Sequence, residues 1–138
     1  MKKSFLILLL LLLTELAFGQ FKPKLITEAD IAKFIALPNI LQRLQLLDEK
    51  QQQELLAKEG LGTEESEYII SKIGFNYTWM YLITVDNSTG ATVDNITKER
   101  EAFFAANPQY KLTGQERSLI EKHKDALGDT MRKFDFGE

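Results

Sequence analysis

The residue types that most often carry out chemistry are scarce in this sequence. Its 138 residues include no cysteine and one histidine, His123. The lack of cysteine removes thiol nucleophiles, disulfides, cysteine-bound zinc, iron–sulfur clusters and covalently attached haem. One histidine excludes an all-histidine metal site within one chain. The sequence also has no calcium loop, phosphate loop, G-x-S-x-G elbow or H-E-x-x-H helix. It therefore predicts a protein that is not an enzyme, with no catalytic residue, metal or cofactor.

Paired carboxylates are the one catalytic chemistry that the composition leaves open. Acidic residues cluster at positions 64–67, 99–101 and 116–121, and glycoside hydrolysis needs two carboxyls across a cleft. Two of these clusters fall at expected helix starts, where the helix dipole favours acids, and the third alternates with basic residues. We interpret them as capping and solvated side chains. A small envelope enzyme with unidentified carboxylates is the alternative.

His123 lies among the apolar residues of the last expected helix. One interpretation is a histidine at the edge of the core, bonded to a carbonyl or to water. The other is an axial haem ligand paired with a methionine. Met131 is on the same helix, so it cannot hold the opposite face of the same iron, and Met80 could do so only across the bundle. We favour the first interpretation and keep His123 as a candidate binding residue.

The stretch from Phe75 to Val85 predicts either a strand or a helix. Its odd positions are all aromatic or β-branched, which is typical of a strand. A strand needs partners, however, and after the turn expected at 86–90 only residues 91–93 could pair with it. We therefore favour one helix from Glu64 to about Val85, although Gly74 inside it costs about 1 kcal/mol. An α+β fold with a strand at 75–85 is the alternative.

As a helix, this stretch has no polar face in its second half. Such a helix is normally buried at the centre of a domain. A domain this small cannot cover every side, so an aromatic edge is expected to bind something. The candidate binding residues are Tyr77, Trp79 and Tyr81. The expected occupant is a protein partner, a second copy of the chain in a homodimer, or an apolar ligand.

Capping signals divide the rest of the chain into further helices. Thr27 with Asp30 opens a helix that is expected to end at Leu37, and Pro38 suits the first position of the next one. Asp48 with Gln51 marks a restart, and a glycine at 60 or 62 ends that segment. Thr63 caps the helix that begins at Glu64.

The second half of the chain has two such starts. Asp94 is expected to cap a helix that closes at residues 107–108, and Thr113 with Glu116 forms a capping box for a last helix through about residue 134. In that helix Arg117–Glu121 and Asp129–Lys133 are spaced for ion pairs. The sequence predicts an all-α fold, a small bundle of four to five helices.

The N-terminus has the pattern of a secretory signal peptide. Two lysines precede nine apolar residues at 5–13, and small residues at 17 and 19 suit cleavage before Gln20. Nine helical residues rise about 14 Å, too short to span a bilayer. We expect a cleaved signal at 1–19, a single helical domain at 20–138, and no stable membrane span after cleavage. Because a secreted domain without cysteine is unusual in eukaryotes, we expect a secreted or periplasmic protein of a bacterial envelope.

Charge argues against nucleic acid as a partner. Residues 1–19 hold two lysines and one glutamate, so the chain from Gln20 has 15 basic and 19 acidic residues and a net charge of −4. Leu112-Thr113-Gly114-Gln115 resembles the L-T-x-x-Q repeat of small periplasmic helical chaperones, with the glutamine one place early and in a single copy. The expected function is protein or ligand binding, with a helical chaperone as a further alternative.

Overall fold

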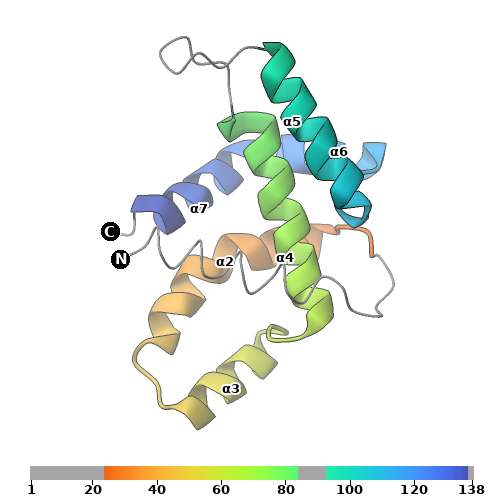
Figure 1. The fold of residues 1–138 in the computed structure, drawn as a ribbon. Helices are drawn as coiled ribbons and strands as arrows, with labels where there is room; N and C mark the ends of the chain where they lie inside the picture. Colours follow the sequence, from red (N-terminus) through yellow and green to blue (C-terminus); the bar gives the residue numbers. More distant parts are fainter. Residues whose placement is uncertain (1–23, 84–92, 137–138) are drawn as a thin grey trace.

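The computed structural model describes residues 24–83 and 93–136, apart from the side chains of 135–136. These ranges contain helices and no strand, so the all-α prediction is confirmed. The predicted signal peptide at 1–19 and the turn at 86–90 lie outside the described residues. Within the described ranges there is one α-helix more than the upper expected number: α2 (Glu28–Leu44), α3 (Glu49–Lys58), α4 (Glu64–Tyr77), α5 (Val93–Ala106), α6 (Gly114–Lys122) and α7 (Lys124–Phe136) (Figure 1).

Two short helices complete this part of the chain. The π-helix η1 (Thr78–Leu82) extends α4, and the 3-10 helix η2 (Pro108–Tyr110) joins α5 to the segment before α6. None of the described helices is both long enough and apolar enough to cross a bilayer.

The core lies where α2, α4 and α7 meet. α4 runs through the middle of the molecule, and α2 and α7 pack against each other and against α4 (Figure 1). Ile31 of α2, Ile73 of α4 and Leu127 of α7 are almost completely buried there, together with Ile120 of α6. α3 contacts α2, and α5 contacts η2. The predicted apolar stripes of α2, α4 and the last helices therefore form one core.

The capping signals place the helix starts correctly. The hydroxyls of Thr27, Thr63 and Thr113 and the carboxylate of Asp48 each accept a hydrogen bond from the backbone N–H three residues later. In all four cases the side chain at that third position bonds back to the capping residue. The end of α3 also follows its signal, because Gly60 and Gly62 have φ of 68° and 80°, a conformation that costs glycine little.

Two predicted boundaries are wrong, one in α2 and one at the start of α5. Pro38 lies inside α2, which continues to Leu44. Leu37 and Ile40 are both buried, so packing on either side of the proline holds one helix together despite the lost backbone hydrogen bond. Asp94 is not an N-cap, because α5 already begins at Val93 and Asp94 occupies its first turn.

The last predicted helix is divided at His123. This residue is the C-cap of α6, with φ −105° and ψ 16°, and α7 starts at Lys124. The chain changes direction between α6 and α7, and α7 packs on both α2 and α4. A single straight helix that continued α6 could not make both contacts. The apolar residues predicted to form one stripe on one helix are therefore divided between α6 and α7.

The predicted helix over 64–85 is confirmed as far as Leu82, and the strand alternative at 75–83 is excluded. Its last turn is wider than an α-helix, since the Ile83 N–H donates to the Thr78 carbonyl over 2.9 Å, five residues back. Residues 84 and 85 are not described. Single π-turns of this kind are frequent at functional sites.

Candidate binding surface around η1 and α5

A cluster of aromatic rings joins the end of α4 to α5 and η2. The Phe75 ring centroid lies 5.2 Å from that of Phe103 and 5.2 Å from that of Tyr110. Trp79 lies 5.9 Å from Phe103, and Phe104 meets Phe103 edge to face at 5.1 Å. These distances are typical of favourable aromatic pairs. Aromatic contacts are therefore what attaches α5 to the body.

The outer part of this region is only partly covered. Eight of the 14 residues of α4 are buried, whereas η1 and α5 contain no buried residue. Trp79 is partly exposed, Leu82 is 46% exposed and Val93 is 64% exposed. On α5, Val93, Ile96 and Phe103 share one side at helical spacing. We call Trp79, Leu82, Val93, Ile96 and Phe103 the η1–α5 surface.

The three aromatic candidates from the sequence divide between the inside and the outside. Tyr77 is buried at 7% exposure, and Tyr81 is partly exposed with its ring centroid 5.0 Å from that of Tyr77. Burial raises the pKa of both hydroxyls. Tyr77 packs so closely on Gly128 of α7 that a Cβ there would lie 2.6 Å from the tyrosine oxygen. Tyr77 therefore belongs to the helix contact, and Trp79 and Tyr81 are the accessible members.

His123 lies at the contact between α6 and α2. Its Nε2 is 2.7 Å from one Glu28 carboxylate oxygen, and the Lys122 ammonium is 2.7 Å from the other. These hydrogen bonds, the one from Lys122 first, lower the pKa of Glu28. The side chain is 27% exposed. His123 thus bonds to a carboxylate rather than to a carbonyl or to water. Met131, expected on the same helix as His123, lies instead on α7, beyond the C-cap of α6, and is buried in the core.

A hollow of about 390 Å³ opens beside the aromatic cluster, between α4, α5 and the segment that leads into α6. Three basic residues line it, Arg100, Lys111 and Arg117, and one acidic residue, Glu101. The rest of the wall includes Asn76, Phe104 and Leu112. We call it the cationic hollow. The sequence did not predict this hollow, because its basic residues come from three separate segments. Only Arg100 has a feature in the sequence that could have indicated the hollow, since it lies on the same side of α5 as Phe103.

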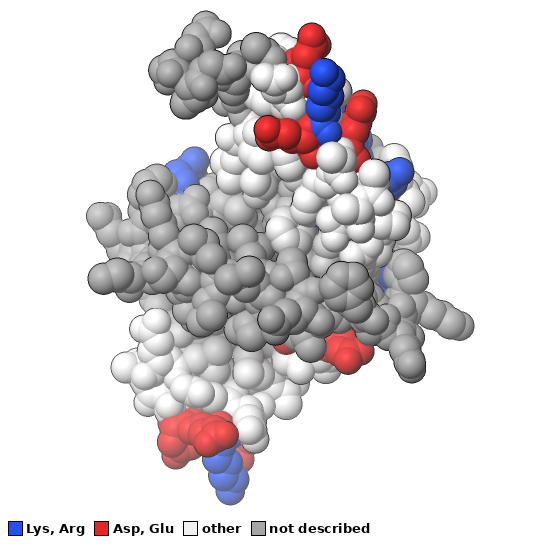
Figure 2. Space-filling view, in the orientation of Figure 1, with Lys and Arg blue, Asp and Glu red and all other residues white. Residues whose placement is uncertain are grey.

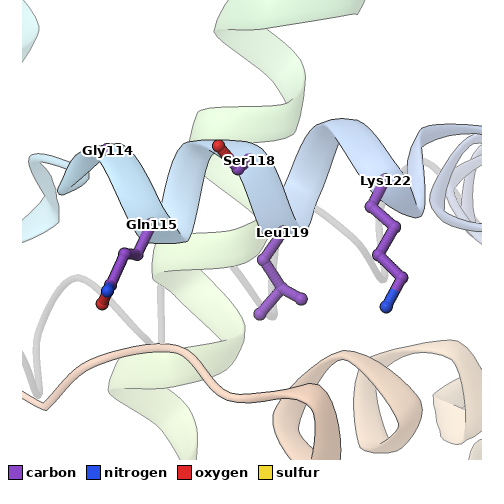
Figure 3. A pocket seen from close by; sticks show the side chains of 5 residues that line it. All are labelled: Gly114, Gln115, Ser118, Leu119 and Lys122. Atoms are coloured by element: carbon purple, nitrogen blue, oxygen red, sulfur yellow. The ribbon is translucent and has the colours of Figure 1, made fainter.

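A second hollow, also about 390 Å³, lies along α6. Figure 3 shows Gln115, Leu119 and Lys122 pointing toward the segment that leads into α2, and Ser118 pointing the other way. Lys122 is already paired with Glu28. This hollow offers one apolar side chain and no unpaired charge, so it is the weaker candidate.

A buried ion pair joins α4 to α6, and sequence reasoning missed it as well. The Lys72 ammonium lies 2.6 Å from the Glu116 carboxylate, and the two side chains are 4% and 2% exposed. The backbone N–H groups of Ile26 and Thr113 also donate to this carboxylate, over 2.9 and 3.0 Å. Lys72 follows Tyr68 and precedes Asn76 on the buried side of α4, and that spacing is the signal that could have found it.

The Glu116 carboxylate is held in its charged form. Burial alone would raise its pKa, but the hydrogen bonds from Lys72, Thr113 and Ile26 outweigh burial and lower the pKa below its usual value. The Lys72 ammonium also donates to the Lys24 carbonyl over 3.4 Å. The pair therefore fixes the segment 24–26 on the body, and with both members buried its role is structural.

Comparison with protein-family models, with curated protein sequences and with solved structures found no match to this chain. Within residues 24–83 and 93–136, no group of three or more histidine, aspartate or glutamate side chains is placed to hold a metal ion. The physical features of the surface and the hollows are therefore the basis for a function.

Proposed function

We propose that this protein is an exported helical binding protein that associates with a second copy of itself through the η1–α5 surface. The observation that carries this proposal is the absence of any buried residue in η1 and α5, although both present large apolar side chains. Exposed apolar patches of this kind mark interaction sites in soluble proteins. Aromatic residues are also enriched at protein interfaces.

A second copy fits this surface better than a charged partner does. The five residues that define the surface are all uncharged, so it needs no oppositely charged partner. The flanks of α5 carry both signs, with Lys98 between Asp94 and Glu99. Figure 2 shows such a mixture of basic and acidic side chains at the α5 end of one face. Two copies related by a twofold axis would use the same apolar surface on both chains and bury apolar side chains against each other.

Association is tested by sedimentation equilibrium on the chain from Gln20, with Trp79→Gln as the variant. We expect a dimer for the wild type and dimerisation at least tenfold weaker for the variant, because the partly exposed indole is the largest apolar side chain of the surface. Leu46→Gln is the matched control, since Leu46 is 87% exposed in the turn between α2 and α3. A wild type that stays monomeric at several hundred micromolar contradicts the proposal, as does an equal loss in both variants.

Export is supported by the sequence pattern at 1–19, with two lysines, nine apolar residues and small residues before Gln20. It is tested by producing the full chain in a bacterium, fractionating the cells and measuring the intact mass of the product. The expected product lies outside the cytoplasm and begins at Gln20. A product that keeps Met1 and remains in the cytoplasmic fraction contradicts export.

A further inference from the structure

We propose that the cationic hollow binds a small organic anion, a carboxylate with an apolar body. This inference goes beyond the proposed function and does not depend on self-association. The hollow has a volume of about 390 Å³. This lies within the range of about 300–1,000 Å³ that is usual for small-molecule sites.

The basic residues of the hollow have no partner among the residues that the structure describes. Within the described part of the chain, the side chains of Arg100, Lys111 and Arg117 form no hydrogen bond or ion pair. The pair expected between Arg117 and Glu121, one turn apart, does not form, and neither does the pair between Asp129 and Lys133, because Asp129 bonds to Arg132. Arg117 acts only at longer range, where it opposes the rise in the pKa of Tyr81 that burial causes.

The gathering of three basic residues around one hollow is the notable feature of this acidic protein. The chain has 20 acidic residues for 17 basic ones, yet three basic residues line one hollow and only Glu101 faces them there. Cations gathered around a concave, partly apolar wall repel each other and raise the local concentration of anions. A bound anion would relieve that repulsion, and arginine is well suited to a carboxylate because its guanidinium can bond to both oxygens.

The remaining walls specify the rest of the ligand. Phe104 and Leu112 supply apolar surface beside the charges. Asn76, 4% exposed, donates its side-chain amide to the carbonyls of Lys72 and Tyr110 over 2.8 and 2.7 Å. Both amide hydrogens are thereby used, which leaves the Asn76 Oδ1 as an acceptor. The walls therefore fit a carboxylate that also carries an N–H donor and an apolar group.

N-acetyl-L-phenylalanine combines these three features and is the probe for the test. Its affinity for the chain from Gln20 is measured by isothermal titration calorimetry, and the contact is located by amide NMR shifts. We expect saturable binding that weakens with added salt, with shift changes centred on Phe104, Lys111 and Leu112. We expect at least tenfold weaker binding for the double variant Arg100→Gln/Lys111→Gln, because two charge-assisted hydrogen bonds are lost.

The controls separate the site from a general effect of charge. Lys98→Gln/Lys50→Gln removes the same charge from two exposed lysines that do not line the hollow, and it should bind like the wild type. The methyl ester of the probe lacks the negative charge, and inorganic phosphate lacks the apolar body, so both should bind at least tenfold more weakly. Thermal melts check that each variant is folded.

Three results would overturn the proposal: no saturable binding of the probe at millimolar concentration, equal weakening in the two double variants, or shift changes that lie away from the hollow. Phosphate or the ester binding as tightly as the probe would also overturn it, because the ligand would then not be an apolar carboxylate. Both double variants are measured on dilute monomer, so a failure of self-association leaves this test intact.

Discussion

The two ends of the continuous helix formed by α4 and η1 both carry large apolar side chains and differ in what surrounds them. Along α4, Ile69 and Ile73 are buried against neighbouring helices, and even Lys72 is enclosed with a partner. Along η1, no residue is buried, and Leu82 is 46% exposed. The difference shows that the number of packing neighbours decides burial here. The α4 end is packed on its neighbours, and the η1 end carries the surface for which we propose self-association.

Removing one member of the buried ion pair should have the largest effect. Lys72→Met leaves the Glu116 carboxylate buried without its cation, which costs about 3–5 kcal/mol of unfolding free energy. Chemical denaturation of the wild type and the variant measures this loss. The double variant Lys72→Met/Glu116→Gln should recover part of the loss because no unpaired charge remains. A loss below about 1 kcal/mol for Lys72→Met would show that the α4 end does not depend on the pair.

Acid should disturb the same pair more gradually. The pKa of Glu116 is lower in the folded protein than its usual value of 4.5, so its ionisation stabilises the fold above that pH. This contribution is lost as the pH falls from about 4.5 through the lowered pKa. Urea denaturation between pH 6 and pH 3 measures the slope. Glu116→Gln should show a flatter dependence over this window, and equal slopes would contradict the assignment.

A substitution at the close contact between α4 and α7 should have the next largest effect on stability. Gly128→Ala places a Cβ 2.6 Å from the Tyr77 oxygen, and relieving that overlap by moving the helices should cost about 1–3 kcal/mol. Thermal denaturation measures the change. Tyr77→Phe in the Gly128→Ala background removes the oxygen and should restore part of the stability. A Gly128→Ala variant as stable as the wild type would mean that the contact is looser than described.

The η1 end should respond least. Trp79→Ala should cost about 1 kcal/mol, well below the 3–5 kcal/mol typical of a fully buried tryptophan, because the ring packs on Phe103 but stays partly exposed. Ile73→Ala, at the buried end of the same helix, is the comparison and should cost about 2–5 kcal/mol. Measured at concentrations where the protein is monomeric, equal losses in the two variants would remove the distinction between the ends.

The sequence predicted most helix starts because the capping signals are local. Thr27, Asp48, Thr63 and Thr113 each form a capping box whose partner lies three residues away, so neither residue needs tertiary context. The helix over 64–82 was predictable for a different reason, since a strand there had no partner. Both arguments use only neighbouring residues and the backbone's need for hydrogen bonds.

The errors occur where tertiary packing overrides local preference. Pro38 is a sound helix boundary by itself, but burial of Leu37 and Ile40 on either side holds α2 together. His123 has no local feature that ends a helix, and α6 ends there as α7 turns onto α2 and α4. Lys72 meets Glu116, and Arg100 lines a hollow with Lys111, only after the helices have packed. Local sequence motifs could not predict these contacts, because the residues that meet are far apart in the sequence.

The bond between the Ile26 amide and the Glu116 carboxylate joins residues 90 positions apart. Synthesis proceeds from the N-terminus, so segment 24–26 cannot form this hydrogen bond until Glu116 has been synthesised. If the chain enters a translocation channel N-terminus first during synthesis, segment 24–26 enters the channel before this hydrogen bond can form. In the proposed export, the contact between segment 24–26 and α6 would therefore form only after segment 24–26 has crossed the membrane.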